Sequence, residues 1–150
     1  MKFLLSALTI FILFATTNSS AQSGMELQLE DYQWENRLLL IFSPSVNHND
    51  FQVMNQIIEE HTEGFTERDL KVFYAAPETD LSIHGTHIEQ NSAETISTKF
   101  DLSDSAFTVL LIGKDGTEKL RSDEAISSQK LFKVIDAMPM RQREMKRDGK

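Results

Sequence analysis

Two continuous apolar runs in this chain predict strands that are buried on both faces. The first run is Leu38–Phe42, and it ends at a Ser-Pro-Ser turn. The second is Phe107–Ile112, and the Gly113–Gly116 segment after it contains Asp-Gly, a strong hairpin signal. Short unbroken runs of this kind are typical of inner strands in an α/β sheet. We therefore expect a hairpin with Thr117–Arg121 as its outer strand.

Hydrophobic positions between and after these strands recur at helical spacing. Asn49 or Asp50 can cap a helix, and Gly64 suits its end. The β-prone segment Leu70–Ala75 follows, which predicts a right-handed parallel crossover. Two further helices are expected, over Ser92–Phe100 and from Ser127 or Ser128 to Pro139. The residues that define the apolar faces of the first and last helices are Phe51, Met54, Ile57 and Ile58, and Leu131, Val134, Ile135 and Met138.

The predicted order of elements is strand, helix, strand, helix, antiparallel hairpin and helix. This is the order of the thioredoxin fold, so we predict an α/β domain with a central four-stranded mixed sheet flanked by helices. The domain is expected over residues 31–140. A polar lead-in at 22–30 precedes it, and a charged tail at 141–150 follows it.

The first 21 residues have the pattern of a secretory signal peptide. Lys2 precedes an apolar run of about 13 residues, which is short of the roughly 20 that span a bilayer. Ser19 and Ala21 are the small residues that suit cleavage after Ala21. We expect an exported protein, periplasmic or extracellular, with no stable membrane insertion after cleavage. An uncleaved membrane anchor is the alternative interpretation.

Composition excludes several classes of chemistry. The chain has 150 residues, a formal net charge of -8 at pH 7 and no cysteine. The acidic balance argues against a nucleic-acid partner. Without cysteine the protein has no thiol redox activity, disulfide, Cys-bound metal or Cys-linked lipid, so its core alone must stabilise it. We predict no cofactor and assign no catalytic residue.

The absence of cysteine affects two specific positions. Thioredoxin-like enzymes place a reactive cysteine at the amino end of the first helix, where the helix dipole lowers the thiol pKa. Counting from Phe42, the two positions of a Cys-x-x-Cys motif fall on Asn47 and Asp50. The place of the usual cis-proline, just before the third main strand, is taken by Phe107. We interpret the residues from Asn47 to Asp50 as a helix-capping turn.

Over roughly residues 31–147 the chain resembles the domain of unknown function 4174. This thioredoxin-like domain is related to modules of vertebrate sushi-repeat-containing protein and coiled-coil-domain-containing protein 80. The resemblance implies the same fold, and it is compatible with a binding role because the vertebrate relatives are associated with the extracellular matrix. It supplies no reaction and no catalytic residues. The segments that carry the resemblance are Trp34, Asn36–Ser45, Glu67–Leu70, Phe107–Gly116, Lys119–Ser122 and Leu131–Arg141.

Two groups of side chains have possible metal or acid chemistry. His84 and His87, with Glu89 nearby, can hold a metal if a third ligand comes from elsewhere. They lie in a predicted loop and not at i and i+4 of a helix, so we interpret them as surface histidines. A thiol-independent, metal-dependent enzyme that uses this pair is the alternative function. Four further acidic residues are interpreted as caps and solvated turns: Asp101, Asp104, Asp123 and Glu124.

The leading hypothesis is a non-catalytic module that binds an unknown protein or an anionic ligand. Basic residues gather at the end of the chain. They either favour the dipole of the last helix and solubility, or contact an acidic partner or lipid headgroups. Tyr32 and Trp34 are expected to pack at the edge of the core. The candidate binding residues are Arg37, Asn47, Asp50, Lys114, Arg121, Arg141 and Arg143.

Overall fold

A five-stranded mixed sheet forms the centre of the molecule. The computed structural model describes residues 24–77, 85–103 and 105–149. The strands are β1 (Arg37–Phe42), β2 (Leu70–Ala75), β3 (Thr86–His87), β4 (Thr108–Ile112) and β5 (Glu118–Ser122). Their order is β3-β2-β1-β4-β5. β1 pairs in parallel with β2 and antiparallel with β4, which makes it the central strand.

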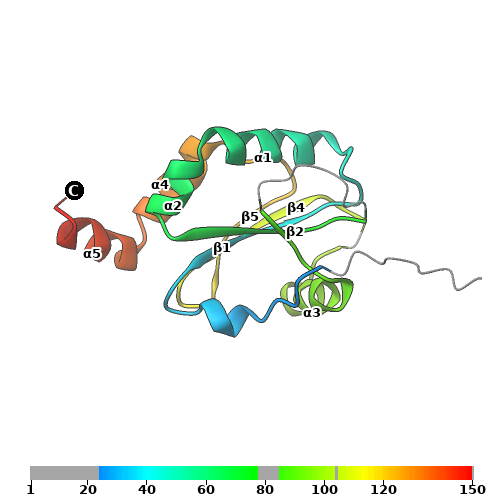
Figure 1. Cartoon of the computed structure of the whole chain (residues 1–150), viewed down its shortest axis with the longest axis horizontal. Coiled ribbons are helices and arrows are strands. Elements are labelled where there is room, and N and C mark those ends of the chain that lie inside the picture. Colours follow the sequence, from blue (N-terminus) through cyan, green and yellow to red (C-terminus); the bar gives the residue numbers. More distant parts are fainter. Residues whose placement is uncertain (1–23, 78–84, 104, 150) are drawn as a thin grey trace, which may run out of the picture.

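Helices cover both faces of this sheet (Figure 1). One face carries α1 (Asn49–Glu60), α2 (Thr62–Glu67) and α4 (Ser128–Asp136), and the other carries α3 (Gln90–Phe100). A short 3-10 helix, η1 (Leu29–Tyr32), precedes β1, and α5 (Pro139–Arg147) extends beyond one end of the sheet.

Side chains of the inner strands alternate between two hydrophobic cores. Leu39 and Leu111 pack with Met54 and Leu131 on the side of α1 and α4. Leu40, on the opposite face, belongs to the cluster of α3. All residues of β1 and β4 are buried, which explains the unbroken apolar runs. Each fully buried aliphatic side chain contributes about 1.5–3 kcal/mol to stability.

The predicted strands are confirmed, with one addition to the sheet. The sequence predicted four strands, and the described residues contain a fifth, β3, which pairs in parallel with Phe73 and Tyr74 of β2. A strand of two residues is too short to produce an alternating pattern. The predicted hairpin is β4 and β5, with a register shift between Leu111 and Ile112.

The first predicted helix is two helices. α1 ends at Glu60, and α2 contains Gly64. A Cβ on Gly64 would lie 2.7 Å from the Phe132 ring, so glycine here permits close packing on α4 and does not end a helix. The cap prediction was also wrong, because His48 is the N-cap and Asn49 and Asp50 lie inside the first turn.

The last part of the chain is helical. Pro139 was predicted to end the last helix, but it begins α5. Proline suits the first position of a helix, where its fixed φ is favourable and its missing N–H is not needed. The predicted charged tail from residue 141 therefore lies largely within α5, and its first residue, Arg141, is 3% exposed.

The folded unit also extends beyond the predicted bounds at its amino end. Leu27 and Leu29, inside the predicted lead-in, are buried in the α3 core. Met25 forms a parallel bridge with Ile88. Within the described residues, no helix is long and apolar enough to cross a membrane.

Candidate functional site

The amino end of α1 is the first candidate site, because the fold prediction places reactive groups there. Asn47 precedes the helix, and its N–H donates to Ser45 Oγ at 3.1 Å. Asp50 Oδ1 accepts a hydrogen bond of 3.0 Å from the N–H of Ala125, in the loop before α4. The Asp50 carboxylate therefore connects α1 to a second segment of the fold.

The neighbouring His48 ring lies flat against Phe107. The two rings are stacked, with centroids 5.3 Å apart and an interplanar angle of 2°. Asp50 Oδ2 is 3.7 Å from His48 Nδ1. Phe107 is 4% exposed and belongs to the core of the α1 face. Among the described residues no peptide bond is cis, and none of these side chains is a thiol.

Three of the predicted binding cations come together at the opposite end of β1. Arg37 is 0% exposed and forms two hydrogen bonds with the Glu144 carboxylate, at 3.1 and 3.2 Å. Lys114 Nζ lies 2.8 Å from Glu144 and 2.7 Å from Asp69. α5 therefore carries the carboxylate that balances two buried cations.

Arg141 extends the same cluster toward α2 and α4. It contacts Asp136 at 3.3 Å and Glu67 at 3.2 Å. Arg68, which the sequence analysis missed, donates to both oxygens of Asp136 at 3.0 and 2.7 Å and lies over the Phe132 ring. We call this group the charge cluster. Its four cations and four carboxylates are Arg37, Arg68, Lys114 and Arg141, and Glu67, Asp69, Asp136 and Glu144.

Two carboxyl groups of the charge cluster have shifted pKa values. Burial of Glu144 by itself raises its pKa, but hydrogen bonds from Lys114 and Arg37 outweigh burial and hold the pKa below the ordinary value. The pKa of Asp136 is lowered in the same way, since the effects of Arg68 and Arg141 exceed that of burial. Both groups therefore stay ionised and paired at neutral pH.

The other predicted cations lie apart from the charge cluster. Arg121, on β5, pairs with Glu118 at 2.7 Å and donates to the carbonyl of Phe100 at the end of α3. Arg143 is exposed on α5 and donates to the carbonyl of Pro139 at 3.4 Å. The structure thus groups Arg37, Lys114 and Arg141 around carboxylates and separates Arg121 and Arg143 from them.

The predicted histidine pair is only partly within the described residues. His87 is in β3, and its ring packs against Tyr74 with centroids 5.3 Å apart. His84 lies outside the described residues. The described part of the chain contains no group of three or more side chains arranged to hold a metal ion. Glu89 is the N-cap residue of α3 and Asp101 its C-cap, in agreement with the interpretation of Asp101 as a cap. Asp123 and Glu124 are exposed, and Asp104 is not described.

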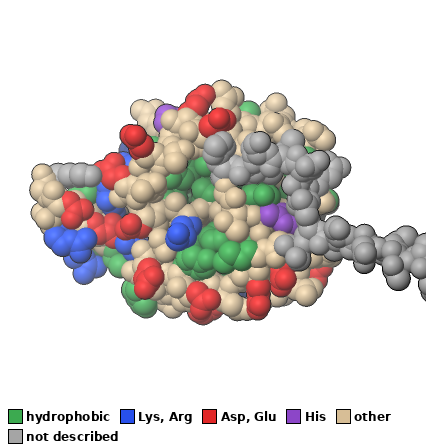
Figure 2. Space-filling view, viewed as in Figure 1, with side chains coloured by type: hydrophobic (Ala, Val, Ile, Leu, Met, Phe, Trp, Pro, Cys, Tyr) green, Lys and Arg blue, Asp and Glu red, His purple; other side chains and the backbone are tan. Residues whose placement is uncertain are grey.

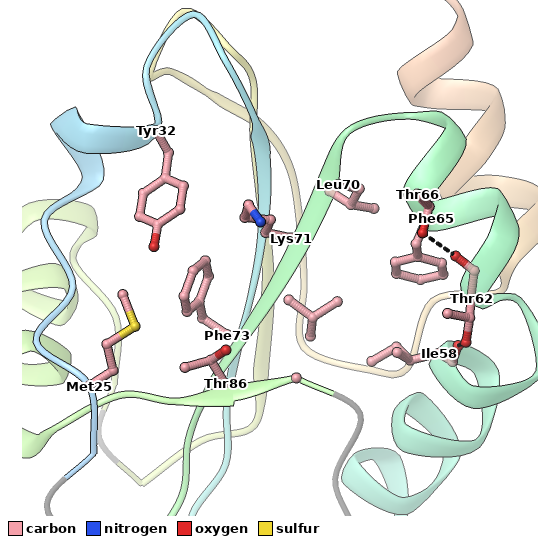
Figure 3. A pocket seen from close by; sticks show the side chains of 12 residues that line it. Met25, Tyr32, Ile58, Thr62, Phe65, Thr66, Leu70, Lys71, Phe73 and Thr86 are labelled. Atoms are coloured by element: carbon pink, nitrogen blue, oxygen red, sulfur yellow. Dashed lines mark hydrogen bonds between the residues drawn. The ribbon is translucent and has the colours of Figure 1, made fainter.

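A pocket of about 370 Å³ lies along the outer edge of β2 (Figure 3). On one side it is bounded by Ile58 of α1 and Phe65 of α2, and on the other by Met25 and Tyr32. We call this pocket the edge groove. The described residues that line it are Met25, Tyr32, Ile58, Thr62, Phe65, Thr66, Leu70, Lys71, Val72, Phe73, Gly85 and Thr86.

The edge groove combines an apolar surface with a basic group. Figure 2 shows hydrophobic side chains gathered near the middle of the face seen, with a basic group among them and acidic groups mainly toward the periphery. Tyr32 packs edge-on against Phe73 at 5.3 Å and fixes one wall. The sequence patterns did not predict this site. Their one signal is Lys71, a charged residue between the apolar residues Leu70 and Val72, which indicates a strand that is partly exposed to solvent.

Trp34 is a further exposed aromatic residue. It is 63% exposed, its φ is 71°, and its N–H donates to the Lys114 carbonyl. The expectation that Trp34 packs at the edge of the core was therefore wrong, whereas Tyr32 does pack there. A bulky residue at positive φ is unusual and is held in place by the surrounding structure.

Comparison with known proteins identifies the fold. A family model described as "Domain of unknown function (DUF4174)" matches residues 28–144. No curated protein matches the sequence.

Solved structures of thiol enzymes are similar to the chain. Reduced 2-Cys peroxiredoxin of Plasmodium vivax aligns with a TM-score of 0.61 and 16% identity, over 78% of this chain and 85% of that one. Thioredoxin peroxidase I of Plasmodium yoelii gives 0.58 and 18%, over 83% and 82%. A putative thiol:disulfide interchange protein DsbE of Chlorobium tepidum gives 0.57 and 10%, over 73% and 86%. The predicted thioredoxin-like fold is confirmed. At sequence identities this low, the similarity supports the fold and not a shared function.

Proposed function

The chain belongs to the DUF4174 family, and on that premise we propose that it is an exported, non-catalytic module that binds another protein. The main support is the amino end of α1, where enzymes of this fold have reactive thiols. In this chain the side chains there make structural contacts instead. Asp50 is bonded to the Ala125 backbone, and His48 is stacked on the buried Phe107. With no cysteine in its 150 residues, the chain has no thiol for the chemistry named for its structural neighbours.

The edge groove supports a binding role. Pockets that accept ligands are concave and mostly apolar, with few polar groups, and span about 300–1,000 Å³. The edge groove has this character, with apolar walls from Ile58, Phe65, Val72 and Phe73. Export is proposed from the pattern of the first 21 residues.

A protein partner is favoured over a free anion. Arg37, Lys114 and Arg141, the buried cations among the predicted binding residues, already contact carboxylates at 3.3 Å or less. An added anion would have to displace Glu144, Asp69 or Asp136 from charge-assisted hydrogen bonds. Such a replacement would add little binding free energy, because the charge cluster contains as many carboxylates as cations.

Site-specific photo-crosslinking in the source organism tests the proposal. A benzophenone amino acid replaces Met25 at the edge groove in the full-length chain, and Trp34 and Val53 in matched variants. These residues are 43%, 63% and 38% exposed, so each probe is accessible. We expect an adduct of defined mass with another protein from the Met25 variant. The absence of any adduct from all three variants, with the protein folded, would contradict the proposal.

A further inference from the structure

The two faces of α5 differ in character. Arg141 and Glu144 face the charge cluster, and their side chains are only 3% and 12% exposed. Residues three and four positions apart lie on the same face of a helix. The exposed residues Arg143, Lys146 and Arg147 have this spacing. We call these three residues the basic face of α5.

The positive charge of the basic face is largely unbalanced. Arg143 donates to the carbonyl of Pro139 in its own helix, at 3.4 Å. Among the described residues, no carboxylate oxygen lies within 4.0 Å of the Arg143 or Lys146 side-chain nitrogens. Arg147 is 78% exposed and contacts Asp148 at 3.4 Å. The basic face therefore differs from the charge cluster, where each cation already has a carboxylate partner.

The basic face belongs to a segment whose net charge is opposite to that of the rest of the chain. Residues 130–150 contain seven Lys or Arg and three Asp or Glu, whereas residues 1–129 contain eight and 20. Figure 2 shows basic side chains concentrated at the end of the molecule that α5 forms, on the left. An acidic chain with a net charge of -8 thus has a positive end.

The position of α5 allows this end to approach a flat surface. The helix extends beyond one end of the sheet (Figure 1), and its nine residues make it about 13 Å long. At physiological ionic strength charges are screened over about 8 Å, which is less than the diameter of about 10 Å of one helix. Acidic side chains on the far side of the molecule therefore act only weakly on a surface that touches α5.

The composition of the basic face favours a lipid surface over a protein surface. Protein interfaces usually have an apolar centre. The exposed residues of α5 are polar or charged apart from Pro139, and Met140 and Met145 are half-buried. Attraction at this face is therefore mainly electrostatic. Such attraction suffices at an anionic bilayer, where each Lys or Arg near the surface increases affinity about fivefold.

We propose that the basic face of α5 binds the surface of a bilayer that contains anionic phospholipid, with headgroup phosphates beside Arg143, Lys146 and Arg147. The contact is peripheral and leaves Glu144 on the opposite face of the helix, within the charge cluster. This inference goes beyond the proposed function, because it requires no protein partner. No residue of α5 is among the described residues that line the edge groove, so the two contacts use different surfaces.

Cosedimentation with lipid vesicles tests this inference. The protein that begins at Gln22, which contains the complete described fold, is mixed with phosphatidylcholine vesicles that contain either no phosphatidylglycerol or about one third of it. We expect binding only to the vesicles with phosphatidylglycerol. The binding should be lost at an ionic strength of about 0.5 M, because salt screens the attraction. Equal binding to both kinds of vesicle, or binding to neither, would overturn the inference.

Three double variants connect vesicle binding to the basic face. Arg143→Gln with Lys146→Gln should lower the partition coefficient about 25-fold, at about fivefold per cation. Arg143→Lys with Lys146→Arg keeps both charges and should bind like wild type. The matched control, Lys99→Gln with Lys119→Gln, removes the same charge from α3 and β5 and should bind like wild type too. All four positions are exposed, so circular dichroism should show a native fold for each variant.

Vesicle binding by the first variant that equals that of wild type would also overturn the inference. An acidic protein is the alternative occupant of the basic face, and labelled polyglutamate is the probe for it. Binding of polyglutamate through Arg143 and Lys146, with no binding to vesicles, would assign the basic face to an acidic protein and overturn the lipid contact. A failure of the proposed function looks different, because then no protein crosslinks at Met25, Trp34 or Val53.

Discussion

Arg37 lies at the start of the central strand, and its charge is balanced there by Glu144. The Arg37 side chain is 1% exposed and that of Glu144 is 12% exposed, so both ions have lost most of their hydration. Arg37 Nε has no hydrogen-bond partner in the described structure. A buried pair of this kind adds little net stability, but removal of Arg37 takes away two charge-assisted hydrogen bonds and leaves the buried Glu144 with Lys114 as its nearest cation.

The first prediction concerns this pair. Arg37→Met should lower the free energy of unfolding by about 3 kcal/mol, measured by urea denaturation at neutral pH. The matched control is Arg121→Met, which removes a half-exposed ion pair and should cost less than about 1 kcal/mol. Equal losses for the two variants would show that burial of Arg37 has no energetic importance.

The second prediction follows from the lowered pKa values of Glu144 and Asp136. A carboxyl whose pKa is lower in the folded state stabilises the fold above its ordinary pKa, and this contribution is lost as pH falls through the folded value. The ordinary values are 4.5 for Glu144 and 3.8 for Asp136. Stability should therefore decrease as pH falls below about 5.

Glu144→Gln separates the contribution of Glu144 from that of the other carboxylates. The difference in unfolding free energy between wild type and this variant should be largest above pH 5 and should shrink steadily toward pH 3. A difference that stays constant over this range would mean that the Glu144 pKa is the same in the folded and unfolded states.

At the scale of single residues, the sequence identified the cations but not their partners. Arg37 and Lys114 stand out in the sequence as basic residues beside apolar runs. The carboxylate that pairs with both is Glu144, 107 positions after Arg37. Hydrophobic patterns report periodicity over neighbouring positions. They could not predict an ion pair between residues so far apart in the sequence. Free cations were therefore predicted where the structure has paired ones.

Among the elements, α1 and the loop before α4 are joined by Asp50. Asp50→Ala removes the acceptor of the Ala125 N–H and should lower unfolding free energy by about 1–2 kcal/mol, read from thermal or urea denaturation. Asp50→Asn keeps an acceptor oxygen and should retain most of the stability. Neither substitution should change crosslinking from the Met25 position, because Asp50 does not line the edge groove.

α5 is the element whose prediction differed most from the structure. Truncation after Met138 removes Arg141 and Glu144 and leaves Arg37 and Lys114 without their shared carboxylate. We expect the truncated protein to melt well below the full-length protein in calorimetry. An unchanged melting temperature would show that the last residues are a dispensable tail.

Four of the described strands, β1, β2, β4 and β5, were predictable because each is a short run of mostly β-prone or apolar residues. The helix boundaries were harder, because Pro139 is compatible with both the end and the beginning of a helix. β3 could not be predicted, since two residues, Thr86 and His87, carry no period of their own. The edge groove depends on this short pairing, so its location emerges only from the assembled sheet.

At the scale of the whole molecule, the two ends of the sheet carry different groups of polar and charged residues. The carboxyl end of β1 leads to Asn47 and Asp50, where the fold prediction placed thiol chemistry. The opposite end carries the charge cluster, and the edge groove lies along the first half of β2, which pairs with the start of β1. The edge groove is therefore separate from the position that holds reactive groups in thiol enzymes of this fold.

Export is the remaining expectation at this scale. Cleavage after Ala21 predicts a mature protein that begins at Gln22. Intact-mass measurement of the protein recovered from the cell envelope or medium of its source organism checks this. An envelope form that retains Met1 would favour the alternative of an uncleaved anchor.

Hydrogen exchange of the bound protein most directly tests the proposal that this fold binds a partner protein at the edge groove. The partner identified by crosslinking is added, and amide exchange is compared with that of the free protein. We expect new protection at Leu70 and Val72, which line the edge groove, with no change at Asn47–Asp50. Protection at Asn47–Asp50, with Leu70 and Val72 unaffected, would contradict it.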